Sequence, residues 1–119
     1  MEIIEERRKL RERCILEAKE WASRIQFKVT AILIGSYARG DFNIWSDIDV
    51  LIISEELTEN PLKRLKDLDI PPGYQVIALT LKEFEKLLEK GEPMITEAIK
   101  YRIVLRDDLN IFSIMNGDK

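Results

Sequence analysis

Two aspartates separated by one residue, Asp47 and Asp49, are the most distinctive chemical pattern of this sequence. They stand at the start of an apolar run at residues 48–53, which is typical of a buried strand. Successive side chains of a strand point to opposite faces, so both carboxylates are expected on one face. Adjacent carboxylates repel each other and are costly to desolvate, and a bound cation explains them most simply. Asp47 and Asp49 are therefore the predicted catalytic and metal-binding residues.

A phosphate site is predicted just before this pair. Gly35 and Ser36 end the apolar run at residues 31–34, and glycine lets the backbone turn tightly and approach a ligand. If Ser36 opens a short helix, its hydroxyl and the first backbone N–H groups can bind an anion. Arg39 adds a positive charge suited to phosphate. A phosphate cradle beside two carboxylates predicts Mg²⁺ bound together with a nucleoside triphosphate.

The elements that must position these residues indicate a mixed α/β chain. Apolar residues at helical spacing predict a long N-terminal helix over residues 2–25, with Trp21 in the core. We expect a small mixed β-sheet with helices packed mainly on one side. Strands are predicted at 27–34, 48–53, 74–80 and 101–105, and helices at 58–68, 81–89, 93–100 and about 109–115. One domain is expected over 1–119, divided into the helix at 1–26, a sheet-and-helix core at 27–106 and a tail at 107–119.

Composition narrows the function classes. The 119 residues, 45% of them hydrophobic, suffice for one core. Charged residues make up 34% with a formal net charge of -3, which argues against strong general binding to nucleic acid. One basic cluster is interleaved with glutamates and is therefore expected to be a solvated helix face. Its members are Arg7, Arg8, Lys9, Arg11 and Arg13.

The sequence contains no histidine, which excludes histidine bases and histidine-ligated zinc. Its single cysteine, Cys14, falls on the apolar face of the first predicted helix, so we expect a buried structural thiol rather than a nucleophile. The first residues lack the apolar stretch of a signal peptide, and no run has the length of a membrane span. A cytoplasmic protein without membrane attachment is the resulting expectation.

Three apolar residues stand out in the predicted insert between the first two strands: Phe42, Ile44 and Trp45. We expect them to pack the insert onto the sheet. The alternative is that Phe42 or Trp45 lines a nucleotide pocket.

The string GSYARGDFNIWSDIDVLII at residues 35–53 resembles the signature of the DNA polymerase beta-type nucleotidyltransferase superfamily. It is most similar to the small stand-alone members, the minimal nucleotidyltransferases. The resemblance implies transfer of a nucleoside monophosphate, AMP from ATP, to a hydroxyl, with a two-metal Mg²⁺ site. It also implies a HEPN-type protein as partner, modified by the transferase acting as the antitoxin of a toxin–antitoxin pair. The sequence is compatible with an oligomer and does not determine the oligomeric state.

Relatives of this kind generally carry a third carboxylate on a later strand, and here that position is Gln75. Glutamine can bind a metal weakly but has no charge and is no base at neutral pH. Asp41, Asp67 or Asp69 could substitute. Two functions therefore fit the sequence: an active nucleotidyltransferase, or a catalytically degenerate module that binds nucleotide or docks a partner. A purely structural role for the aspartates and the Gly-Ser turn is the remaining alternative.

Overall fold

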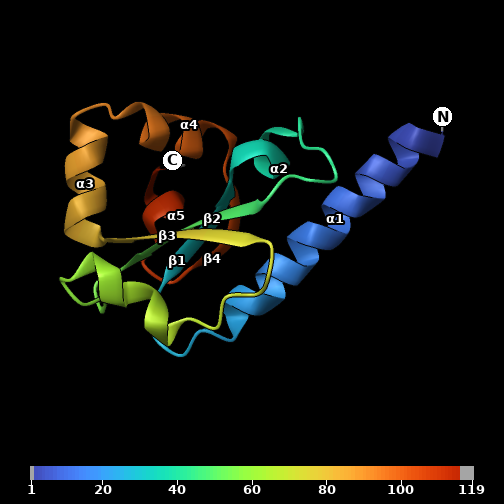
Figure 1. Cartoon of the computed structure of the whole chain (residues 1–119). Coiled ribbons are helices and arrows are strands. Elements are labelled where there is room, and N and C mark those ends of the chain that lie inside the picture. Colours follow the sequence, from blue (N-terminus) through green and yellow to red (C-terminus); the bar gives the residue numbers. More distant parts are fainter. Residues whose placement is uncertain (1, 116–119) are drawn as a thin grey trace.

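The structure is a computed structural model, and it describes residues 2–115 (Figure 1). Within these residues the chain runs from a long helix through alternating strands and short helices to a single helical turn. In chain order the elements are α1 (Glu2–Ser23), β1 (Thr30–Ile34), α2 (Gly35–Arg39), β2 (Ile48–Ser54), the 3₁₀ helix η1 (Pro61–Asp67), β3 (Tyr74–Thr80), α3 (Leu81–Glu89), α4 (Pro93–Tyr101), β4 (Ile103–Asp107) and α5 (Ile111–Met115).

The strands form one mixed sheet in the order β3-β2-β1-β4. Strand β1 is antiparallel to both of its neighbours, β2 and β4. Strand β3 is parallel to β2, and the crossover that a parallel pair requires contains η1. The predicted α/β fold with a small mixed sheet and a long N-terminal helix is confirmed. Its consequence for the site is that the first residues of β2 lie between the end of β1 and the start of β3.

Every residue of β1 is buried, so both faces of the sheet need a cover. Figure 1 shows α1 along one side of the molecule and α3, α4 and α5 gathered on the other. The expectation of helices mainly on one side is therefore corrected: each face has its own helical layer. One core cluster joins Ala31, Leu33, Val50 and Ile52 to Trp21 of α1, and the other joins Ile32, Ile34, Leu51 and Ile53 to Phe84, Ile95 and Phe112.

Helix α1 buries one face against the sheet. Cys14 and Trp21 are 6% and 3% exposed, which confirms both as core residues. The Trp21 indole N–H donates to the backbone oxygen of Asp69 at 2.7 Å, so the buried ring keeps its polar group satisfied. Burial also raises the pKa of the Cys14 thiol, and this favours the unreactive protonated form.

Some predicted boundaries move by several residues. β1 begins at Thr30 rather than 27, because the preceding backbone forms hydrogen bonds with side chains instead of a neighbouring strand. The Arg106 side chain donates to the Phe27 carbonyl, and the Val29 N–H donates to the Asp108 carboxylate. The helix expected at 58–68 is the shorter η1, capped by the side chain of Asn60. Helix α4 runs on to Tyr101, which delays β4 to residue 103.

The predicted helix near 109–115 is confirmed as α5. The Asp107 carboxylate accepts hydrogen bonds from the backbone N–H groups of Ile111 and Phe112, at 2.9 and 3.0 Å. This bonding turns the chain back so that Phe112, 2% exposed, enters the core. Residues 116–119 of the predicted tail lie outside the described part of the chain.

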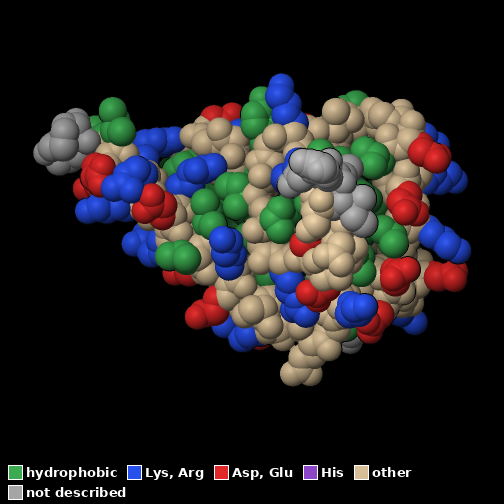
Figure 2. All heavy atoms as spheres, turned by 180° about the vertical axis from the view of Figure 1, so that it is seen from behind, with side chains coloured by type: hydrophobic (Ala, Val, Ile, Leu, Met, Phe, Trp, Pro, Cys, Tyr) green, Lys and Arg blue, Asp and Glu red, His purple; other side chains and the backbone are tan. Residues whose placement is uncertain are grey.

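The surface carries both signs of charge, interspersed over the face that Figure 2 shows. The first turns of α1 project beyond the body of the domain in Figures 1 and 2, where Ile3 and Ile4 are 71% and 74% exposed. Among the residues described, no helix is long and apolar enough to cross a membrane.

Candidate active site

Asp49 lies in the middle of the site, as the second residue of β2. In the register of the sheet it stands opposite Ile34 of β1 and Gln75 of β3. Its carboxylate is half-buried, whereas Asp47, just before the strand, is exposed. Burial raises the pKa of Asp49, the Asp47 carboxylate raises it further, and Arg39 opposes both effects. The two aspartates therefore form an electrostatically strained pair that a cation would stabilise.

Gly35 leaves room for this carboxylate. Its φ of +74° lies in the left-handed region, where side chains are strained. A Cβ atom added there would overlap Asp49 Oδ2 and lie 3.1 Å from the Asp49 carboxyl carbon. Only glycine therefore allows the end of β1 to approach the Asp49 side chain so closely.

Ser36 is the second residue of α2, which begins at Gly35, two residues earlier than a Ser36 cap requires. Ile34 is the N-cap residue, and no side chain caps this end. Gly40, with a φ of 96°, ends the helix by donating its N–H to the Ser36 carbonyl. The Gly35–Ser36 backbone thus lies at the open start of a short helix, beside Asp49.

Arg39 is the cation of the site, and two carboxylates already bind it. Its Nε donates to Asp41 at 3.2 Å, and its Nη1 donates to Glu97 of α4 at 3.0 Å. The hydrogen bond to Asp41 is the largest cause of a raised Arg39 pKa. A phosphate that bound Arg39 would therefore compete with these two carboxylates.

Two arginines of α1 hold α2 and the insert in place. Arg11 donates to the carbonyls of Tyr37 and Ala38, at 2.7 and 2.9 Å. Arg7 donates to the Gly40 carbonyl at 3.3 Å, and its guanidinium lies 4.4 Å from the centre of the Phe42 ring. These contacts satisfy carbonyls at the C-terminal end of α2 and connect the site to the long helix.

The expectation that the basic cluster is a solvated face is therefore wrong for Arg11, which is half-buried, whereas Arg7 is exposed as expected although it also contacts the insert. It holds for Arg8, which pairs with Glu5 and Glu12 on the surface. The sequence did carry a signal, because positions 7, 11, 14 and 18 share the helical spacing of the buried face. This spacing is hard to recognise because glutamates are interleaved with the arginines.

The insert is half packed and half exposed. Phe42 is buried and stacks on Tyr37 with ring centroids 4.3 Å apart, as the packing interpretation predicts. Ile44 and Trp45 are 73% and 86% exposed, so that interpretation is wrong for both. A compact turn presents them: the Trp45 N–H donates to the Asn43 side chain at 2.8 Å.

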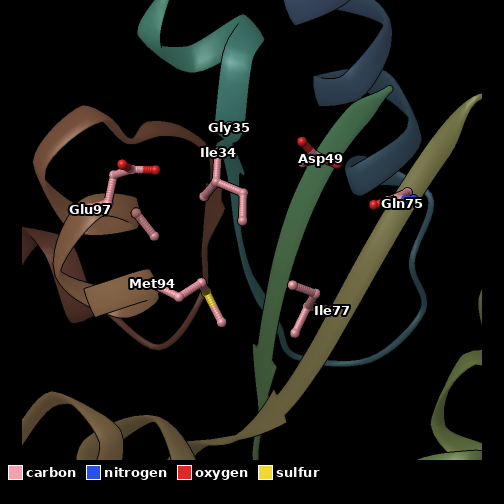
Figure 3. Close-up of a pocket in the computed structure, with 8 residues that line it drawn as sticks. Ile34, Gly35, Asp49, Gln75, Ile77, Met94 and Glu97 are labelled. Carbon is pink, nitrogen blue, oxygen red and sulfur yellow. The ribbon is translucent and has the colours of Figure 1, made fainter. Parts of the chain in front are cut away.

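A cavity of about 250 Å³ opens beside Asp49 (Figure 3). Asp49 and Gln75 approach it from the strands, and Met94 and Glu97 from α4 on the other side. The Glu97 carboxylate points toward the end of β1 at Gly35 (Figure 3). The complete lining is Ile34, Gly35, Asp49, Gln75, Ile77, Met94, Glu97 and Ala98.

Two of the proposed substitutes for the third acid, Asp41 and Asp69, do not line this cavity. Asp69 borders a different cavity with Trp21, and Asp41 is paired with Arg39. The side chain of Asp67 lies outside the described part of the structure. Glu97 is the acid that sequence reasoning missed, because it occupies an ordinary polar position of a helix. Within residues 2–115, no three histidine, cysteine, aspartate or glutamate side chains are grouped so that they could hold a metal.

The donor set fits Mg²⁺ that arrives with a substrate. Asp47 and Asp49 offer carboxylate oxygens, the ligands Mg²⁺ prefers, and the strain of the pair favours a cation. Two carboxylates leave coordination positions for phosphate oxygens and water, as is usual for Mg²⁺.

Two comparisons with known proteins both find similarity to nucleotidyltransferases. The sequence model described as a nucleotidyltransferase domain matches residues 14–117. Among solved structures, a candidate nucleotidyltransferase from Sulfolobus solfataricus has a similar fold, with a TM-score of 0.54 and 22% sequence identity. The similarity covers 85% of this chain and 83% of the other. A search of curated proteins finds no match.

Proposed function

Because the chain belongs to the nucleotidyltransferase domain family, we propose that it transfers AMP from ATP to a hydroxyl acceptor with the help of Mg²⁺. The observation that carries this proposal is the approach of Gly35 to Asp49. It puts the glycine-serine turn and the carboxylate pair at one place, where a triphosphate and its metal can bind together.

Each residue then has a separate task. Asp47 and Asp49 would hold Mg²⁺. The bound cation would neutralise the negative charge of the phosphates and lower the pKa of the attacking hydroxyl. The Gly35–Ser36 backbone receives phosphate oxygens, and Arg39 offers its guanidinium to the same charge. The acceptor oxygen attacks the α-phosphorus, and pyrophosphate leaves in line with it.

The acceptor that we propose is a hydroxyl on a HEPN-type partner protein, which the chain would modify as an antitoxin. The exposed turn with Ile44 and Trp45 supports a protein acceptor, because it places apolar surface two residues before Asp47. We also propose that the protein acts in the cytoplasm.

Gln75 favours a second candidate function. With an amide opposite Asp49, the site has the residues to bind Mg²⁺ and a triphosphate but lacks a β3 carboxylate. The chain would then be a degenerate module that binds nucleotide or docks its partner without turnover.

Incubation of the chain with ATP labelled at the α-phosphate, Mg²⁺ and a HEPN-type protein encoded beside it distinguishes the two candidates. Active transfer labels the partner, and the pair Asp47→Asn with Asp49→Asn abolishes the label. Asp69→Asn is the matched control and keeps it, because Asp69 lies at another cavity. Nucleotide binding without label or pyrophosphate, even at high enzyme concentration, selects the degenerate module.

A further inference from the structure

We propose that Glu97 of α4 is the general base of the reaction, in the role that the missing β3 carboxylate would have. This inference rests on the proposed transferase function. The geometry behind it is the cavity next to Asp49, which Glu97 lines from the opposite wall to Asp49 and Gln75 (Figure 3).

The cavity suits an acceptor group better than a nucleotide. Its volume of about 250 Å³ is below the ~300–1,000 Å³ of pockets that enclose small-molecule ligands. Ile34, Ile77 and Met94 make its walls largely apolar, which suits the stem of a hydroxyl-bearing side chain. A hydroxyl that enters the cavity meets Asp49 on one side and Glu97 on the other.

Glu97 is the carboxylate of this lining to which no metal-binding role is assigned. Asp49 is assigned to the metal, and Gln75 cannot act as a base. Glu97 belongs to α4, whose Ile95 and Ala98 are buried in the core, so the helix that carries it is firmly placed. Its side chain is 57% exposed, so a proton that it accepts can be passed to water.

The ion pair with Arg39 links this role to nucleotide binding. Before substrate binds, Glu97 Oε1 accepts a hydrogen bond from Arg39 Nη1 at 3.0 Å, so the guanidinium occupies one of its oxygens. A triphosphate that draws the Arg39 guanidinium toward its phosphates releases Glu97. The acceptor O–H then breaks, its proton passes to Glu97, the new O–P bond forms, and the bond to pyrophosphate breaks.

The test separates a base from a mere partner of Arg39. Glu97→Gln keeps a hydrogen-bond acceptor for Arg39 but cannot take a proton. Asp41→Asn removes charge from the other partner of Arg39 and is the matched control. Glu89→Gln, on the exposed side of α3, controls for loss of surface charge. Pyrophosphate release from Mg–ATP is measured with glycerol and N-acetyltyrosinamide as hydroxyl probes, and binding is measured with Mg–α,β-methylene-ATP.

We expect Glu97→Gln to lower the turnover rate by about 100-fold or more, the usual contribution of a general base, with unchanged affinity for the analogue. Asp41→Asn should change turnover only a few-fold, and Glu89→Gln should not change it. Adding Gln75→Asp to Glu97→Gln should restore part of the lost rate, because it puts a carboxylate opposite Asp49.

Equal losses in Glu97→Gln and Asp41→Asn, or wild-type turnover in Glu97→Gln, overturn the role of Glu97 and leave the transferase intact. A wild-type chain that binds the analogue but releases no pyrophosphate with either probe or with a HEPN-type partner overturns the transferase function, and the role of Glu97 with it.

Discussion

Gln75 stands directly opposite Asp49 in the parallel register of β3 and β2, and both side chains line the same cavity. This pairing places an amide where a third carboxylate would complete the aspartate pair. If the site binds Mg²⁺ as proposed, its affinity for the metal should depend on this position of β3.

Replacing Gln75 with aspartate should tighten divalent-cation binding, since a third carboxylate would face the same metal. The measurement is a titration with Mn²⁺, a paramagnetic substitute for Mg²⁺, in the wild type and in Gln75→Asp. Gln75→Glu tests the reach of the longer side chain. Unchanged Mn²⁺ affinity in both variants would mean that residue 75 does not face the metal.

Gly35→Ala should unfold the chain more easily and abolish nucleotide binding, because the new methyl group would overlap the Asp49 carboxylate. Gly91→Ala is the matched control: Gly91 has a similar φ of +68°, but an added Cβ meets nothing within 4 Å. The control should lose only the ~1–2 kcal/mol of left-handed strain. Urea denaturation gives both free energies of unfolding, and equal losses would contradict a steric role for Gly35.

Asp49→Asn should stabilise the metal-free protein at neutral pH. The folded state raises the pKa of Asp49 above its ordinary value of 3.8, mainly through burial and then through Asp47, so the ionised side chain destabilises the fold. That cost is present above the folded pKa and disappears as pH falls below 3.8, where both states are protonated.

Thermal unfolding with and without Mg²⁺ tests whether the ionised Asp49 destabilises the metal-free protein. Without metal, the gain of Asp49→Asn should be present at neutral pH and vanish in acid. Added Mg²⁺ and ATP should stabilise the wild type more than the variant. A variant less stable than the wild type at neutral pH would show that Asp49 has a structural role.

Arg11→Ala should loosen α2, whose Tyr37 and Ala38 carbonyls it binds. Hydrogen bonds of a charged donor contribute about 1.5–3 kcal/mol, and a loss in that range is expected by urea denaturation. Arg8→Ala, which removes only surface pairs with Glu5 and Glu12, is the control and should change stability little. Nucleotide affinity should fall in Arg11→Ala alone. Equal stabilities and equal nucleotide affinities of the two variants would show that Arg11 does not hold α2 in place.

The core strands could be predicted from the sequence, because the apolar runs at 31–34 and 48–53 and the strand at 74–80 need no distant contact to be recognised. The aspartate pair and the glycine-serine turn could be located for the same reason. The start of β1 could not, since the Phe27 carbonyl bonds to Arg106, 79 residues away along the chain. Glu97 could not be found either: only the packing of α4 against the sheet brings it to the cavity of Asp49.

Surface and core roles were hardest to separate at charged and aromatic positions. Phe42 and Trp45 are both aromatic insert residues, yet one stacks on Tyr37 and the other is exposed. Local spacing does not distinguish them, because the tight turn at Asn43 decides which side chain points inward.

Asp47 and Asp49 are proposed to support Mg²⁺-dependent nucleotidyl transfer. The most direct measurement is the release of pyrophosphate from ATP, with Mg²⁺ and a HEPN-type acceptor protein, by the wild type and by Asp49→Asn. The wild type should release pyrophosphate together with AMP-labelled acceptor, and Asp49→Asn should release at least about 100-fold less. No release by the wild type, or equal release by the variant, would rule out this role of the two aspartates.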